Sequence, residues 1–230
     1  MKLTESQIVE NYELHKNIID QYLPSERAAA VKNMIEQIGE EVYATAPASG
    51  KNWYHGAYAG GYIVHVNTVV KYALMQMNLY AKMKGIINFT TEELVFSALF
   101  HDLGKVGNGE EPNYIPNDSE WHVKNQGAIY KANSNIDFML VPDRSLYLLQ
   151  KYGVKVSQQE YLAIKLHDGI FDESNKAYYI NYSPDSRFKT NIVPILHVAD
   201  YLASRVEFDI EKESKWLKHC VYFYWFMQVS

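Results

Sequence analysis

The residues of this 230-residue chain with the clearest chemical potential are histidines and aspartates in five short segments. The segments are HGAYAGGYIVH (55–65), ALFHDLGK (98–105), EWHVKNQGAIY (120–130), AIKLHDG (163–169) and ILHVADYLASR (195–205). The chain holds 8 histidines but 1 cysteine, so imidazole and carboxylate groups must bind any metal. Divalent ions other than magnesium and calcium accept such mixed shells. A multi-cysteine zinc site and a disulfide framework are excluded.

The pair His101–Asp102 is the anchor of a metal-site hypothesis. Adjacent residues on a helix project about 100° apart, so both can reach one ion only at a helix end or from a wall that flanks it. Gly104 breaks the helix just after the pair and leaves Lys105 near the same mouth, where its ammonium could meet a phosphate oxygen. A single His-Asp pair is weak evidence, and the order of all five segments is what favours a metal centre.

The elements that must position these residues are helices. Apolar residues recur at spacings of three and four over 63–77 and 192–206. Further helices are expected at 8–19, 25–43, 91–104, 120–132, 144–151, 158–166 and 212–227. The turn-rich loops 107–118 and 168–186 are candidates for covering a site, and AYYINY (177–182) is a candidate strand. We therefore predict an all-α fold, a single globular helical bundle with at most one short β-hairpin.

The helix over 192–206 shows how one ligand could be presented. Its inward stripe is expected to consist of Ile195, Ala199, Leu202 and Val206. Asp200 lies about 100° from the centre of this stripe, at the shoulder between core and solvent where a partly buried ligand belongs. His197 lies farther round and is expected to orient another side chain. His15 and His219 lie outside every segment and are expected to be ordinary helix residues.

Composition excludes several classes of protein. Charged residues make up 21% of the chain, which argues against extensive disorder. The sequence has no run of about 18 apolar residues, so no membrane span is predicted. The first residues are interrupted by charges and do not form a signal peptide, so we expect a cytoplasmic protein. The net charge of −5 argues against a general polyanion-binding surface but leaves room for a local basic pocket.

Taken together, the segments resemble the HD-domain metal-dependent phosphohydrolases over residues 50–210. The family pattern is a histidine, a later His-Asp pair and a distant aspartate, which here would be His65, His101–Asp102 and Asp200. GGYIVH is similar to the GGLLEH-type start of the family's first ligand helix. HGAYAGG and ILHVADYLASR resemble segments of bacterial HD-domain 3′→5′ exonucleases, with Gly56 in place of a second histidine. Outside this core, the sequence pattern predicts N-terminal helices at 1–49 that pack on it and an aromatic C-terminal helix at 211–230.

Two further segments bear on the number of metal ions. WHVKNQGAIY resembles a segment of the family's two-metal members, and LHDG stands where they carry HH-x-G. The resemblance implies that His122 and His167 join Asp102, as a bridging carboxylate, around a second ion. Asp168 stands where many relatives have a second histidine, so the shell of that ion stays open. Two ions are favoured over one, with manganese, iron, cobalt or nickel as the first candidates and zinc or magnesium as alternatives.

The activity that the resemblance implies is hydrolysis of a phosphate ester of a nucleotide by a metal-activated hydroxide. Asp102 would act as a ligand, and Lys105 would offset charge on the phosphoryl oxygens and contact the substrate. His55, Tyr58 and Asp168 are expected to contact the substrate too. An oligonucleotide 3′ end, cleaved by an exonuclease or phosphodiesterase, ranks slightly lower. Those exonucleases carry a nucleic-acid-binding module, and the roughly 50 residues before His55 leave no room for it.

Two other functions stay open. Some HD-domain relatives use a di-iron pair to activate oxygen, and because some of them share HDLGK, Lys105 does not discriminate between the two chemistries. A non-catalytic nucleotide-binding domain would show a broken ligand set, of which Asp168 is the one hint. The helix at 211–230 could pack on the core, form the face of a homodimer or continue into a partner.

Overall fold

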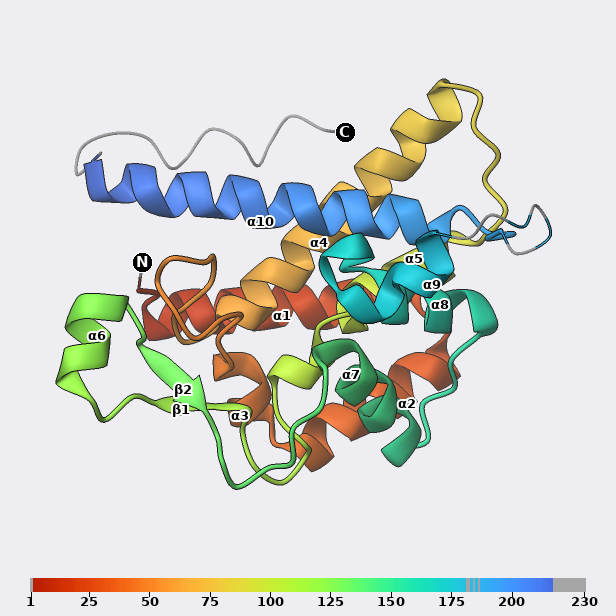
Figure 1. Ribbon diagram of the computed structural model, residues 1–230. Helices are drawn as coiled ribbons and strands as arrows, with labels where there is room; N and C mark the ends of the chain where they lie inside the picture. Colours follow the sequence, from red (N-terminus) through yellow and green to blue (C-terminus); the bar gives the residue numbers. More distant parts are fainter. Residues whose placement is uncertain (1, 181–182, 184, 186, 217–230) are drawn as a thin grey trace.

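The computed structural model describes residues 2–180, 183, 185 and 187–216, and these residues are mostly helical (Figure 1). The α-helices are α1 (Glu5–Tyr22), α2 (Ser25–Ile38), α3 (Glu40–Thr45), α4 (Gly61–Lys82), α5 (Thr91–Phe100), α6 (Glu120–Gln126), α7 (Val141–Lys151), α8 (Gln158–Leu166), α9 (Lys176–Tyr179) and α10 (Ile192–Trp216). Short 3₁₀ turns are η1 (Leu103–Lys105), η2 (Gly169–Phe171) and η3 (Glu173–Asn175). Strands β1 (Tyr114–Pro116) and β2 (Tyr130–Ala132) pair antiparallel. The predicted all-α class is confirmed.

The two longest helices, α4 and α10, cross each other and form the centre of the bundle (Figure 1). Helix α5 packs against α4, α8 packs against both α5 and α10, and α1 and α3 cover the other side of α4. Helix α4 buries the apolar stripe that the sequence predicts, with Ile63, Val66, Val70 and Ala73 in the core. Burial of these stripes against one another, rather than helix propensity, holds the bundle together.

The predicted inward stripe of α10 is correct in its first half and wrong in its second. Ile195 and Ala199 are buried, but Leu202 and Val206 are 36% and 37% exposed. The buried positions that follow are Ala203 and Glu207. An α-helix has 3.6 residues per turn. Ala203 and Glu207 follow Ala199 at intervals of four residues and stay on the face that meets α4, whereas Leu202, three residues after Ala199, lies off this face.

Helix starts follow their capping residues. Thr90 and Ser157 each accept a hydrogen bond from the backbone of the third helical residue, and the glutamate there bonds back to the cap. These capping boxes place the starts of α5 and α8 where the sequence predicts them.

Three predicted boundaries are wrong for local backbone reasons. The helix predicted at 25–43 is split into α2 and α3 at Gly39, which adopts a φ of 100°. The helix predicted at 120–132 ends at Gln126, because Gly127 adopts a φ of 58° and the chain turns into β2. Residues 176–179 form α9 instead of a strand, and the only strand pair in the described part of the chain is β1–β2.

The C-terminal prediction is tested only in part. Helix α10 runs on through Trp216, so the residues up to that point continue it rather than start a separate helix. Residues 217–230, and with them most of the aromatic segment and its predicted packing or dimer face, lie outside the described residues. Among the described helices, none combines the length and the apolar character that a bilayer crossing requires.

A buried polar network ties α1 and α3 to α4. His15 is fully buried, with Nδ1 2.9 Å from Asn67 Oδ1 and Nε2 3.0 Å from the Tyr43 hydroxyl. Burial lowers the pKa of His15 from 6.5 to about 4, although the hydrogen bond with Asn67 acts in the opposite direction. The imidazole is therefore neutral at neutral pH and serves as a structural link.

This network predicts a loss of stability in mild acid. The unfolded chain binds a proton at His15 below pH 6.5, whereas the folded chain does so only near pH 4. The contribution of neutral His15 is therefore full above pH 6.5 and is lost as the pH falls towards 4. Between pH 7.5 and 5 the free energy of unfolding should fall by about 2 kcal/mol from this residue. Urea unfolding in EDTA should show that His15→Gln removes this part of the pH dependence. An unchanged dependence would contradict the prediction.

Candidate metal centre

The structure brings together five of the six metal ligands expected from the sequence. His65 Nε2 lies 3.0 Å from Asp200 Oδ1 and 3.5 Å from Asp102 Oδ2. His101 Nε2 lies 3.5 Å from Asp102 Oδ2 and 3.6 Å from Asp200 Oδ1. His167 Nε2 lies 3.6 Å from Asp102 Oδ1. The two oxygens of Asp102 therefore face different histidines, in a cluster that could hold a metal ion.

These ligands come from helix ends and helix faces that the core packing brings together. His65 lies in the second turn of α4, and Asp200 lies on the face of α10 that meets it. His101 and His167 are the C-terminal caps of α5 and α8. The expectation that the His101–Asp102 pair lies at a helix end is confirmed. The carboxyl ends of both helices also point at the cluster, and their partial negative charge favours a cation there.

The hydrogen bonds of the imidazoles select the nitrogen that can bind a metal. Nδ1 of His101 donates to the Ala98 carbonyl and Nδ1 of His167 to the Ile164 carbonyl, both at 2.8 Å. A carbonyl can only accept, so Nδ1 keeps its proton, and Nε2 is the nitrogen that can exchange a proton for a metal ion. Nε2 of His65 and Nε2 of His101 are buried and face the carboxylate oxygens of Asp102 and Asp200.

Electrostatics show that the cluster needs positive charge. Burial lowers the pKa of His65, but Glu207 and Asp200 outweigh it and raise this pKa to about 10. Burial raises the pKa of Asp102, but Lys105 and His101 hold it well below its usual value. Asp102 and Asp200 are therefore charged at neutral pH. Lys105 balances one of these charges, so protons on the imidazoles or a cation must balance the other. Buried imidazole nitrogens that share charged carboxylate oxygens fit a divalent transition-metal ion.

Helix α7 clamps the turn that carries the His-Asp pair. The Ser145 hydroxyl accepts from Gly104 N at 2.8 Å and lies 3.0 Å from the His101 carbonyl oxygen, to which it can donate. The buried Arg144 donates to the carbonyls of Gly104 and Asp137. Gly104 itself is pressed against α7, because a Cβ there would lie 2.4 Å from the Val141 carbonyl oxygen. The turn and α7 are thus one packing unit.

Glu207 is a site residue that the sequence analysis missed. Its Oε2 lies 3.0 Å from His65 Nδ1 and 3.9 Å from His55 Nε2, and these three residues form a further group of potential metal donors. Because Glu207 follows Asp200 by seven residues, both lie on the same face of α10, two turns apart. That spacing was the available signal. A carboxylate on the outer nitrogen of a ligand histidine fixes the ring and raises its basicity.

Of the expected substrate-contacting residues, His55 lies beside the cluster, whereas Tyr58 is buried. The His55 ring lies 4.4 Å from the His65 ring between centroids, and its buried Nε2 lacks a hydrogen-bond partner among the described residues. Burial, followed by the charges of His65 and Lys105, lowers the pKa of His55 to about 2, so the ring is neutral at neutral pH. Tyr58 is buried in the loop before α4, which leaves little of its surface for a substrate.

The remaining expected site residues take different positions. Lys105 Nζ lies 2.5 Å from Asp102 Oδ2, inside the cluster. Asp168 lies at the rim, with Oδ2 3.6 Å from His167 Nε2. His197 Nδ1 lies 2.6 Å from the His167 carbonyl oxygen, so it supports the backbone of a ligand rather than another side chain. His122 is exposed on α6, with Nδ1 2.6 Å from Ser119 Oγ, and is part of no donor group in the described chain.

Comparison with known proteins adds no relative. No family model, no curated protein and no solved structure matches the chain. The family therefore stays an expectation from the sequence motifs, and function has to be argued from the cluster itself.

Glu207 predicts a measurable effect on metal binding. Glu207→Gln keeps the shape of the side chain but removes the charge beside His65 Nδ1. We expect the affinity for Mn²⁺ and Co²⁺ to fall about 10- to 100-fold, because partners of ligand histidines have effects of this size. Isothermal titration of the metal-free protein with each ion measures it. Asp209→Asn, an exposed change on the same helix, serves as the matched control, and equal affinities in both variants would contradict the role of Glu207.

Proposed function

We propose that the protein is a metal-dependent phosphohydrolase that cleaves a phosphate ester of a nucleotide. The observation that carries the proposal is the buried cluster of His65, His101, Asp102, His167 and Asp200, with Lys105 beside it. The order of these residues in the chain is that of the HD-domain phosphohydrolases, and their imidazole nitrogens converge on two charged carboxylates. The convergence of these buried imidazole nitrogens on shared carboxylate oxygens supports a site for a divalent cation.

The same five residues would hold the ion. Three imidazoles and two carboxylates suit manganese, iron, cobalt or nickel. With His122 on the surface, His167 and Asp102 alone are too few described ligands for a separate second ion, so we propose one ion in this arrangement. When bound, a divalent ion lowers the pKa of a coordinated water towards neutrality and polarises a phosphoryl oxygen.

The chain's own residues supply charge and position. Burial lowers the pKa of the Lys105 ammonium, but Asp102 raises it above its usual value, so Lys105 is charged at neutral pH. From its place beside Asp102 it can offset negative charge on a phosphoryl oxygen. The neutral His55 ring lies beside His65 and can accept or donate a hydrogen bond to the bound ester. The clamp from α7 keeps the His101–Asp102 turn in place.

A substrate panel tests this function. Metal-free protein is reconstituted with Mn²⁺, Co²⁺, Ni²⁺ or Fe²⁺ and given nucleoside mono- and triphosphates, cyclic nucleotides and short oligonucleotides. We expect release of phosphate or nucleotide with at least one ion, and loss of that activity in His101→Ala. Turnover of oligonucleotides alone would favour the exonuclease alternative. Activity with Mn²⁺ without oxygen would exclude the di-iron oxygenase. No turnover with any ion, or equal turnover by His101→Ala, would overturn the proposal.

A further inference from the structure

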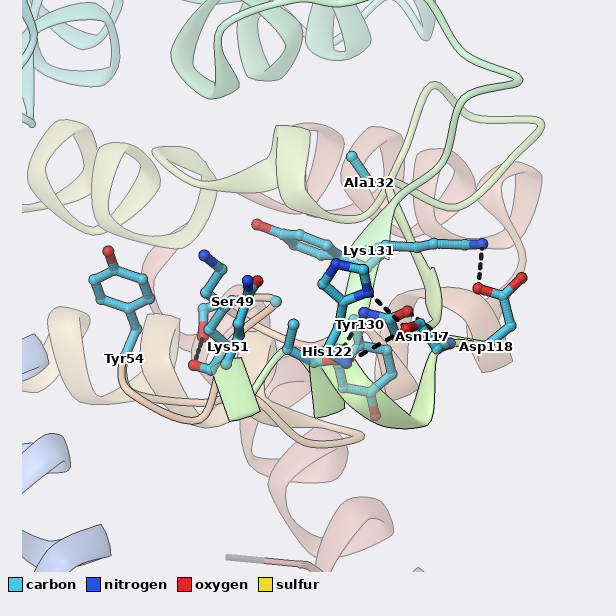
Figure 2. A pocket seen from close by; sticks show the side chains of 14 residues that line it. Ser49, Lys51, Tyr54, Asn117, Asp118, His122, Tyr130, Lys131 and Ala132 are labelled. Atoms are coloured by element: carbon cyan, nitrogen blue, oxygen red, sulfur yellow. Dashed lines mark hydrogen bonds and ion pairs between the residues drawn. The ribbon is translucent and has the colours of Figure 1, made fainter. Parts of the chain in front are cut away.

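A cavity of about 600 Å³ opens between the loop 49–54 and the hairpin β1–β2 (Figure 2). In Figure 2, Tyr54 and Lys51 lie on one side of this space, and His122, Tyr130 and Lys131 lie on the other. The volume lies within the range of sites that bind small organic ligands, about 300–1,000 Å³. The cavity contains none of the metal-donor groups, so its side chains have no role in the site described above.

The walls of the cavity are held together by backbone contacts. Asn52 N donates to the Gly127 carbonyl at 2.8 Å, and Tyr130 N donates to the Gly50 carbonyl at 2.9 Å. Gly127 adopts a φ of 58°, and a Cβ there would lie 2.2 Å from Trp53 Nε1. The loop and the hairpin therefore approach as closely as a glycine allows, and the cavity has a defined shape.

The charge of the cavity is positive, in contrast to the net charge of −5 for the whole chain. Lys131 is paired with Asp118 at 2.8 Å, so these two charges balance. The ammonium of Lys51 is exposed and has no ion-pair partner among the described residues. His122 adds an imidazole ring, and Ser49 and Ser119 add hydroxyl groups. An anion with several hydrogen-bonding groups fits this lining.

Aromatic rings surround the opening. Tyr54, which lines the cavity, is 61% exposed, and its neighbour Trp53 is 62% exposed. Trp121, next to His122 on α6, is 60% exposed. Large aromatic side chains that are exposed together beside a polar cavity are typical of a binding surface, and their faces stack on nucleobases.

Two connections link the cavity to the metal centre. Tyr54 lines the cavity, and the ring of the next residue, His55, lies 4.4 Å from the ring of His65 between centroids. The loop 49–54 leads directly into His55, whose carbonyl accepts from Ser49 Oγ at 2.9 Å. The segment that borders the cavity therefore leads directly to the metal centre through His55.

We propose that this cavity binds the nucleoside part of a nucleotide whose phosphate lies at the metal centre. Tyr54 stacks on the base, and Lys51 attracts the anion. The inference rests on the proposed function for the role of the metal centre, but it concerns binding by residues outside that centre.

The test measures binding without turnover. The full chain with Mn²⁺ is titrated by calorimetry with nucleoside 5′-phosphonates of the four bases, whose carbon–phosphorus bond resists hydrolysis, and separately with inorganic phosphate. Tyr54→Ala should raise the Kd of the phosphonates about 10-fold, because stacking of one base on an aromatic ring has an effect of this size. It should leave the Kd of inorganic phosphate unchanged. Lys51→Ala should raise the Kd of the phosphonates several-fold.

Matched variants keep the result interpretable. Tyr161→Ala and Lys82→Ala are exposed changes on α8 and at the end of α4, away from the hairpin (Figure 1), and should bind like the wild type. Tyr54→Phe keeps the ring and should retain binding. Equal phosphonate affinity in Tyr54→Ala, Lys51→Ala and the controls would overturn the cavity assignment even if nucleotides are hydrolysed. If the variants show the expected binding pattern but the protein hydrolyses no nucleotide, the result supports the cavity assignment and rejects the proposed phosphohydrolase function.

Discussion

Asp102→Asn is expected to lower both metal affinity and the kcat/KM for hydrolysis by more than about 100-fold. The Asp102 carboxylate lies within 3.6 Å of the Nε2 atoms of His65, His101 and His167, and it also pairs with Lys105. Asparagine has nearly the same volume, so the change removes the charge on which these groups converge rather than the packing. Elemental analysis after dialysis against Mn²⁺ and steady-state kinetics measure the two effects.

A surface aspartate provides the control for this prediction. Asp20→Asn removes a carboxylate that pairs with Lys32 on the surface of the helical bundle, and exposed pairs contribute little. We expect wild-type metal content and kinetics from it. If Asp102→Asn retained a full complement of metal and its activity, the assignment of Asp102 as the central ligand would be wrong.

Gly104→Ala is expected to disturb the metal centre without changing any ligand. The new Cβ would lie 2.4 Å from the Val141 carbonyl oxygen and 3.2 Å from Ser145 N, both backbone atoms of α7. Neither can rotate away, so the turn that carries His101–Asp102 must shift. We expect a loss of about 3 kcal/mol in the free energy of unfolding and weaker Mn²⁺ binding. Urea unfolding in EDTA and calorimetric titration measure the two quantities.

Gly153→Ala separates a backbone effect from a packing effect. Gly153 adopts a φ of 71°, so alanine there is strained by about 1–2 kcal/mol, but no atom lies within 4 Å of its Cβ. This variant should lose some stability and bind Mn²⁺ normally. Equal metal affinity in the two glycine variants would argue against the clamp from α7.

The sequence predicts those parts of the fold that depend on local signals. The stripe of α4, the start of α5 and the bounds of α8 follow from spacing and caps within a few residues, and all are found. The prediction allowed one short hairpin but placed its candidate strand at 177–182. The position was wrong because β2 is stabilised by pairing with β1, fourteen or more residues earlier, and not by a pattern of its own.

The same division applies to the candidate metal centre. The His-Asp pair at a helix end is a local pattern, and the structure places it there. The partners of that pair are not local. Glu207 lies 142 residues from His65, and Ser145 lies 44 residues from His101. Glu207 and Ser145 belong to no motif, and they become part of the site only through the packing of α10 and α7. One sequence does not reveal this packing.

The distribution of the ligands along the chain also governs when the metal centre can form during folding. His65 and Glu207 meet only after α4 and α10 have docked, which requires closure of most of the chain into a loop. An ion therefore cannot nucleate this fold, as zinc does in small zinc-binding domains. An ion at this site would bind a finished structure and stabilise it by mass action, so metal occupancy at saturating metal would report the folded population of the chain.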